Sequence, residues 1–212
     1  MTERIIIADD HPLFRAALGH AVASVWPDAT VIEASSAGEA RAALAEPAEC
    51  LLLDLHMEDS NGLSVLMDVR QDYPAVPVVI VSASEEPRVY SAAAQLGAAA
   101  FIPKSASLPV LREALQAVRE GDNWFPDTGD EVEDDDLARI SSLTPAQRRI
   151  LEHMRAGLLN KQIAYELSIS EATVKAHITA IFRKLNVISR TQAAMLAAKL
   201  DVDQPAADST TS

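Results

Sequence analysis

The chain has 212 residues, of which 49% are hydrophobic and 23% are charged. This length suits one or two domains, and this apolar content supports packed cores, which excludes a chain that is disordered throughout. The longest apolar runs fall far short of the roughly 18 residues that a membrane span needs, and the first residues do not open a signal peptide. We therefore expect a cytoplasmic protein with no membrane association. The single cysteine, Cys50, opens an apolar run, which predicts a buried thiol.

The net charge of −13 is distributed unevenly along the chain. Residues 1–142 carry a net charge of −16, residues 143–200 carry +6, and the last twelve residues carry −3. This division indicates two domains, of which only the second, basic one suits a polyanion.

Short apolar runs in the first half of the chain alternate with helical patterns such as the one over 108–118. The runs lie at 4–8, 29–33, 50–55, 76–83 and 99–103. Strands that alternate with helices form βαβ units, in which helices cover both faces of a parallel sheet. We predict an α/β doubly wound, five-stranded parallel sheet for the first domain, residues 1–122.

Four of the predicted strands end in a polar residue. These residues are Asp9 and Asp10, Asp54, Ser82 and Lys104. The carboxyl ends of strands in an open parallel sheet form ligand sites, so the five side chains should lie together. Adjacent carboxylates repel one another unless a cation lies between them, and Mg²⁺ prefers oxygen ligands. A carboxylate can also attack phosphorus when a cation neutralises the developing charge, so the pattern predicts a site for Mg²⁺ and a phosphoryl group.

Residues 123–142 contain an acidic run at 130–136 and few apolar side chains, which predicts a linker. Beyond it, residues 143–200 have only helical patterns. Thr144 and Gln147 form a capping box for a helix that should stop near Gly157, and further helices are predicted over 161–167, over 171–185, and from Ser189 to about Leu200. Residues 201–212 are predicted to be a flexible tail.

The helix predicted over 171–185 has two different faces. Its apolar residues Val174, Ile178, Ile181 and Leu185 have the spacing of a buried stripe. The opposite face carries Ala172, Lys175, Ala176, Thr179 and Arg183. Small and basic side chains on one helix face fit the major groove of DNA, although from this helix alone a solvated face is an equal alternative.

The first domain resembles the receiver domain of two-component response regulators. The resemblance covers about residues 3–121 and rests on the motifs at 7–14, 52–57, 61–63, 81–83 and 101–104. It implies that Asp54 accepts phosphate from a sensor histidine kinase. It also implies that Asp10 ligates Mg²⁺ directly and Asp9 through water, that the backbone carbonyl of His56 is a further ligand, and that Ser82 and Phe101 are a switch pair.

This chain departs from the family pattern beside the acceptor. It reads Met57-Glu58-Asp59-Ser60 where the family commonly has Met-Pro, which adds negative charge and could hinder phosphorylation. His56 and Ser84 stand two positions beyond Asp54 and Ser82, where the family tunes the lifetime of the phosphate. We hypothesise that His56 affects the attack of water on it.

The second domain resembles the LuxR-type helix-turn-helix over about residues 142–200. The motifs include those at 143–145, 160–164, 169–177 and 183–185. The resemblance implies that 171–185 is the recognition helix, with Lys175, Ala176 and Thr179 nearest the bases. Further expected DNA contacts are Asn160, Lys161, Thr173, Arg183, Lys184 and Arg190.

Together the two resemblances predict a response regulator of the NarL/FixJ type, a phosphorylation-controlled regulator of transcription that binds double-stranded promoter DNA. The face formed by 85–97 and 99–103, with Arg88, Tyr90 and several alanines, is predicted to form a homodimer. Shielding of the basic domain by the acidic linker is a competing route of control.

One alternative function is a regulator that is independent of phosphorylation and uses the receiver as a dimerisation scaffold. The other is an aspartyl-phosphate phosphohydrolase, which is disfavoured because no second acid/base is evident; we expect only self-phosphorylation and self-dephosphorylation rather than an enzyme.

Overall fold

The computed structural model describes residues 3–57, 59, 62–127 and 135–201. The chain divides into two compact units, Met1–Glu133 and Asp134–Ser212. Glu58, Asn61, most of the acidic run and the tail beyond residue 201 lie outside the described residues.

The first unit is built on a parallel sheet, as the alternating pattern predicts. Its described strands are β1 (Arg4–Ala8), β2 (Thr30–Ala34), β3 (Cys50–Asp54), β4 (Val78–Ser82) and β5 (Ala100–Pro103). They lie in the order β2-β1-β3-β4-β5, and every neighbouring pair is parallel. Every residue of β3 and β4 is buried, because both faces of the sheet are covered and a continuous apolar run is needed there. The predicted α/β doubly wound fold is confirmed.

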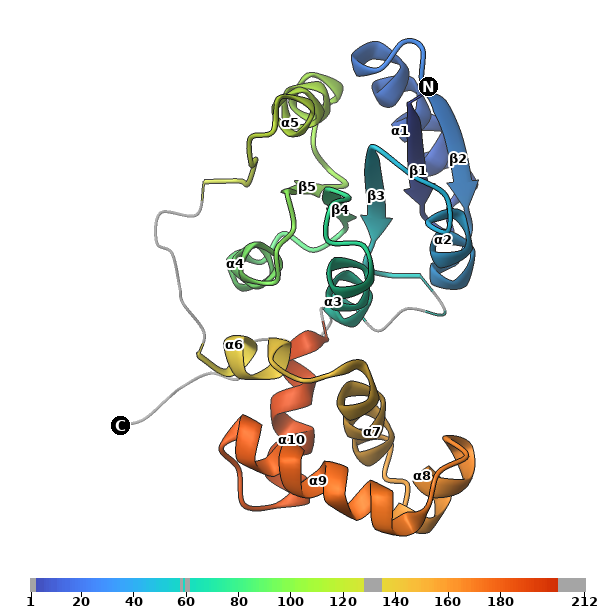
Figure 1. Cartoon of the computed structure of the whole chain (residues 1–212). Helices are drawn as coiled ribbons and strands as arrows, with labels where there is room; N and C mark the ends of the chain where they lie inside the picture. The colour runs from blue at the N-terminus through green and yellow to red at the C-terminus, as the bar shows by residue number, and fades with distance from the viewer. Residues whose placement is uncertain (1–2, 58, 60–61, 128–134, 202–212) are drawn as a thin grey trace, which may run out of the picture. The chain divides into compact units, whose positions relative to one another are not determined.

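Helices cover the two faces of this sheet. They are α1 (Pro12–Val25), α2 (Ala37–Ala43), α3 (Leu63–Asp72), α4 (Pro87–Gln95) and α5 (Leu108–Glu120). Helices α1 and α5 lie on one face, and α2, α3 and α4 lie on the other (Figure 1). Proline stands at the start of α1, α4 and α5, where its missing N–H has no helical partner to lose. Gly62 precedes α3 with φ +52° and ψ −123°, a conformation that only glycine adopts readily.

The chain after α5 returns to the edge of the sheet. Gly121 ends α5 in the left-handed conformation, and Trp124 then forms a parallel bridge with Ala100 of β5. The Phe101 N–H donates to the Trp124 carbonyl at 3.0 Å, and the Trp124 N–H donates to the Ala99 carbonyl at 3.0 Å. The indole N–H of Trp124 donates to Glu113 on α5 at 3.2 Å. The outer edge of β5 is therefore paired with backbone from its own chain.

The second unit is helical throughout its described part. Its elements are α6 (Asp135–Ser141), α7 (Pro145–Arg155), α8 (Asn160–Glu166), α9 (Glu171–Leu185), α10 (Arg190–Ala197) and the 3₁₀ turn η1 (Ala198–Leu200). Thr144 and Gln147 make the predicted capping box of α7, and Ser170 and Ser189 cap α9 and α10. The described helices of the chain include none that is long and apolar enough to cross a membrane.

Helix α6 corrects the sequence prediction, which placed residues 135–141 in an unpacked linker. Leu137 and Ile140 stand three residues apart, so they share one face of the helix, and both are buried. The acidic Asp136 accepts from Arg139 at 3.0 Å and from Lys199 of η1 at 2.6 Å. Two buried apolar residues at helical spacing and two cations that pair with Asp136 therefore hold this segment to the rest of the second unit.

Candidate functional site

The carboxyl ends of β1, β3 and β5 bring three of the predicted side chains into contact. Asp9 follows β1, Asp54 ends β3 and Lys104 follows β5. The Lys104 ammonium lies 2.7 Å from Asp9 Oδ2 and 2.7 Å from Asp54 Oδ2, and both carboxylates are buried. One cation therefore neutralises part of the charge of two buried anions, which would otherwise be costly in a low-dielectric interior.

The position of Lys104 also affects its protonation. Burial lowers the pKa of Lys104, but hydrogen bonds and charge interactions with Asp54 and Asp9 outweigh this effect, so its pKa lies above the usual value. Lys104 is consequently a permanent cation at neutral pH.

The acidic side chains also form a group of the kind that holds a metal ion. Oxygen or nitrogen atoms of Asp9, Asp10, His11 and Asp54 all lie within 4.8 Å of one another. Asp9 Oδ2 and Asp10 Oδ1 are buried. The Lys104 ammonium lies 2.7 Å from Asp9 Oδ2, and His11 Nδ1 lies 2.5 Å from Asp10 Oδ1. Buried carboxylate oxygens with unused lone pairs fit a hard divalent cation such as Mg²⁺.

Backbone groups hold the carboxylates in place. The His11 N–H donates to Asp9 Oδ1 at 2.8 Å, and the His56 N–H donates to Asp54 Oδ1 at 3.0 Å. Arg15 on α1 donates to the Asp9 carbonyl at 2.5 Å and to Glu33 of β2 at 3.1 Å. The sequence analysis did not identify Arg15 as a site residue. Arg15 lies in the first turn of the helix that follows Asp9 and Asp10, and this turn lies next to the end of β1. Its position in the sequence could therefore have indicated a contact with the site.

Ser82 ends β4 and is completely buried, as its predicted place requires. Its hydroxyl oxygen accepts from the Ser84 N–H at 3.2 Å and lies 3.3 Å from the His56 ring nitrogen Nδ1. The same nitrogen is 3.7 Å from Asp54 Oδ1. The ring of His56 therefore stands between the predicted acceptor and the predicted switch hydroxyl, which the sequence could not show.

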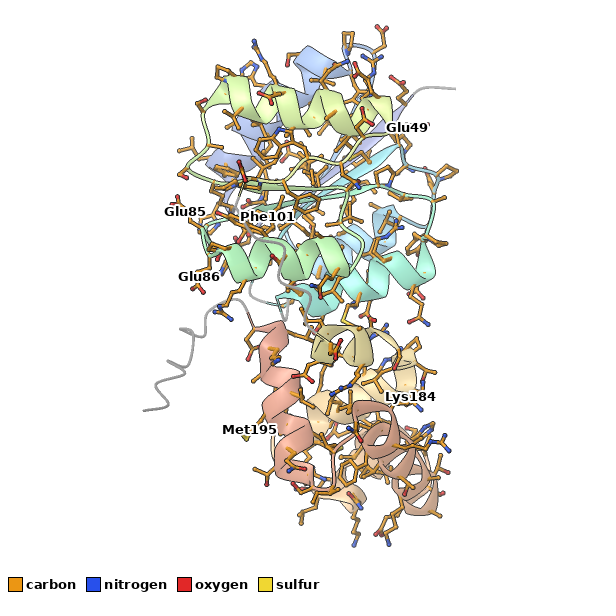
Figure 2. All side chains as sticks on the ribbon, turned by 90° about the vertical axis from the view of Figure 1, so that its left-hand side faces the viewer. Glu49, Glu85, Glu86, Phe101, Lys184 and Met195 are labelled. Carbon is orange, nitrogen blue, oxygen red and sulfur yellow. The ribbon has the colours of Figure 1, made fainter. Side chains whose placement is uncertain are left out.

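Phe101 on β5 is completely buried and lies inside the first unit, as Figure 2 shows. Its ring centroid is 4.5 Å from that of Tyr90 on α4. Tyr90, Ala92 and Ala93 are buried too, so the prediction that they belong to a dimerisation face is wrong for these three residues, whereas Ala94 is exposed and Arg88 is partly exposed. The apolar side of α4 is used to cover the sheet, because that buries the most apolar surface within one chain.

The loop after β3 is anchored at Asp59. Its two carboxylate oxygens accept from the N–H groups of Ala37 and Gly38, at 2.8 and 3.0 Å. Asp59 therefore ties the segment after the acceptor to the start of α2. The neighbouring Glu58, which the sequence analysis singled out for its charge, is outside the described residues.

In the second unit, α9 has the two faces that its sequence predicts. Val174, Ile181 and Leu185 are fully buried, and Ile178 is partly buried. The opposite face is exposed at each predicted position: Ala172, Lys175, Ala176, Thr179 and Arg183. The Lys175 ammonium pairs with Glu171 at 3.0 Å, and the Thr179 hydroxyl donates to the Lys175 carbonyl at 3.0 Å.

The remaining predicted DNA contacts fall into two groups. Lys161 and Thr173 are exposed on the surface of the second unit. Lys184 instead donates to the Ser142 carbonyl at 2.6 Å and to Gln147 at 3.0 Å.

Arg190 likewise makes contacts within the unit. It donates to the Met154 and Leu158 carbonyls and to the Asn160 side chain, so it ties α10 to the turn between α7 and α8. For Lys184, Arg190 and Asn160 the sequence could not reveal these internal partners.

Both units match known families. Residues 5–116 match the response regulator receiver domain, and residues 141–197 match the luxR family of bacterial regulatory proteins. The glycerol metabolism activator of Pseudomonas putida is 37% identical, over 93% of this chain and 96% of the relative. The nitrate/nitrite response regulator protein NarP of Escherichia coli is 32% identical, over 91% and 93% of the two chains.

A solved structure with the same fold is RcsB of Salmonella enterica serovar Typhimurium, bound to the promoter rprA in the presence of a phosphomimetic. It has a TM-score of 0.56 and 22% identity, and the match covers 94% of this chain and 100% of that chain. The two domain matches and the curated relatives, aligned over more than 90% of this chain, establish that this chain belongs to the two-component response regulators of the NarL/FixJ type. These are transcription regulators with a receiver domain and a LuxR-type DNA-binding domain.

Proposed function

We propose that Asp54 accepts a phosphoryl group from a sensor histidine kinase and that this event controls promoter binding by the second unit. The observation that carries the proposal is the contact of buried Asp54 with Lys104 and, through Lys104, with Asp9. A carboxylate oxygen of Asp54 would form the new bond to phosphorus while the bond from phosphorus to the imidazole nitrogen of the donor breaks, and that nitrogen keeps the electron pair.

Asp9, Asp10, Asp54 and the backbone carbonyl of His56 would hold Mg²⁺ here. A bound Mg²⁺ neutralises charge on the phosphoryl oxygens. Lys104 offers its positive charge to the same oxygens, and Ser82 offers a hydroxyl hydrogen bond. A phosphoryl group adds about −1.5 to −2 charges, which these groups engage in one arrangement only, so the receiver shifts its population toward that arrangement.

The test is incubation with a small acyl phosphate and Mg²⁺. We expect one phosphoryl group per chain, base-labile and acid-stable, on Asp54, and a larger oligomer if a homodimer forms. The Asp54→Asn variant is the matched control and should stay unlabelled. A wild-type protein that gains no phosphoryl group would refute the proposal and favour a regulator that is independent of phosphorylation.

For the second unit we propose that α9 enters the major groove, with Lys175, Ala176 and Thr179 nearest the bases and Arg183 beside them. Lys161 and Thr173 are proposed to contact phosphates. Because Lys184, Arg190 and Asn160 already have partners inside the unit, we propose that they act mainly by holding the unit in shape.

A salt titration of binding to a nonspecific duplex separates these roles. A phosphate contact releases counterions, so its loss should reduce the slope of log affinity against log salt by about 1. We expect this reduction for Lys161→Ala and not for Lys184→Ala, which should instead lower the unfolding temperature. Equal losses of slope in both variants would contradict the assignment of Lys184.

A further inference from the structure

Lys104 has a neighbour that is neither acidic nor on a strand. The ring centroid of Phe14, in the first turn of α1, lies 4.7 Å from the Lys104 ammonium. This distance is within the range in which the negative face of an aromatic ring attracts a cation. Lys104 is therefore bounded by two carboxylates and by one aromatic ring.

The ring itself is fixed by its surroundings. Phe14 is partly buried and packs against the core between the sheet, α1 and α5. Its neighbour Leu13 is 88% exposed and Arg15 is bonded to the Asp9 carbonyl, so the first turn of α1 presents Phe14 and Arg15 inward and Leu13 outward. Packing against this core restricts the movement of the ring.

We propose that Phe14 is a positioning residue, whose ring holds the Lys104 ammonium between Asp9 and Asp54 and so prepares it for the incoming phosphoryl group. The inference rests on the proposed phosphoryl transfer. A lysine has a long flexible side chain, and ordering it costs conformational entropy at the moment of reaction unless it is ordered beforehand. Phe14 provides that order without adding a hydrogen-bonding group that would compete with the carboxylates.

A core residue that only fills space would act differently from an aromatic positioning residue. Phe14→Leu retains an apolar side chain without a π face, whereas Phe14→Tyr retains the face. The hydroxyl of the tyrosine adds one polar atom to a side chain that is only partly buried. Leu13→Ala is the matched control in the same turn.

Two readouts test the inference. The first is the proton resonance of the Lys104 ε-methylene in a protein with labelled lysine, assigned among the five lysines by its loss in Lys104→Met. Protons above a ring face are shifted upfield, and we expect this shift in wild type, Leu13→Ala and Phe14→Tyr but not in Phe14→Leu. The second is the rate of labelling of Asp54 by acyl phosphate, which should fall about fivefold in Phe14→Leu and less than twofold in Phe14→Tyr.

The outcomes separate this inference from the proposed function. If the Lys104 resonance of the wild-type protein has no upfield shift, or if Phe14→Tyr loses as much labelling rate as Phe14→Leu, Phe14 is not a positioning residue. The first of these results needs no variant of Phe14, so a failure of Phe14→Leu to fold does not prevent the test. If the shift is present but wild-type Asp54 takes no label, the phosphoryl-transfer function fails, and the role of Phe14 in it fails with it.

Discussion

Replacing Lys104 by methionine tests the central charge arrangement of the receiver unit. The change keeps a long apolar side chain and removes the ammonium that lies 2.7 Å from each of two buried carboxylates. At this distance and an effective dielectric constant of about 20, the Coulomb attraction between Lys104 and each carboxylate is about 6 kcal/mol. The desolvation of each buried ion opposes this attraction and costs several kcal/mol.

The net cost of removing one partner of a buried ion pair is about 3–5 kcal/mol. Because 17% of the Lys104 side chain is exposed, water can take over some of the compensation, and we expect about 3 kcal/mol. The measurement is urea unfolding of the full chain in magnesium-free buffer, followed at the transition of the receiver unit.

Asp54→Asn in the Lys104→Met background should recover at least about 1.5 kcal/mol, since it removes one of the carboxylates left without a cation. Mg²⁺ should stabilise Lys104→Met more than wild type, because it replaces the missing positive charge. The exposed Lys161→Met is the control and should change stability by less than about 0.5 kcal/mol. If Lys104→Met is as stable as this control in magnesium-free buffer, the reasoning about the buried charges is wrong.

Three further predictions follow from other described residues. The pKa of Lys104 is higher in the folded state than in the unfolded chain, so its stabilising contribution is complete below the unfolded pKa and is lost as pH rises through the folded pKa. The stability difference between wild type and Lys104→Met should therefore shrink only in strongly alkaline solution. Urea unfolding across that pH range measures this difference. Burial raises the pKa of Cys50 to about 12, so a thiol reagent should modify the native protein only at the rate at which the unit opens, and rapid modification of the folded protein would contradict the burial. Ile140→Ala in α6 should destabilise the second unit by about 2–5 kcal/mol in thermal or urea unfolding, whereas a loss under about 0.5 kcal/mol would mean that α6 does not pack as described.

Much of the fold was predictable because its signals are local. Apolar runs of four to eight residues, helix-starting prolines and capping boxes act over a few positions in the chain, and they predicted the strands of the receiver and helices α7 to α10 of the second unit. The gathering of Asp9, Asp54 and Lys104 was also predictable, because parallel strands must place their carboxyl ends at one edge.

The rest depended on contacts between residues far apart in sequence. Lys184 donates a hydrogen bond to Ser142, which lies 42 positions earlier in the chain. Phe14 near the start of the receiver unit contacts Lys104 near its end. The charge run before α6 suggested a solvated linker, because the apolar contribution of Leu137 and Ile140 appears only when the second unit provides a surface for them. Tyr90 was misjudged for a similar reason, since its burial depends on the position of Phe101.

The bridge between Trp124 and β5 has a consequence for dividing the protein into fragments. A receiver fragment cut after Asp122, the boundary predicted from the sequence, would lose the backbone partner of Phe101 and leave the outer edge of β5 open. An unpaired parallel edge is a template for pairing with another chain, so such a fragment should self-associate at concentrations where a fragment extended through Asp127 stays monomeric in the absence of a phosphoryl donor. The segment that follows α5 and contains Trp124 thus protects the outer edge of β5 from pairing with another chain.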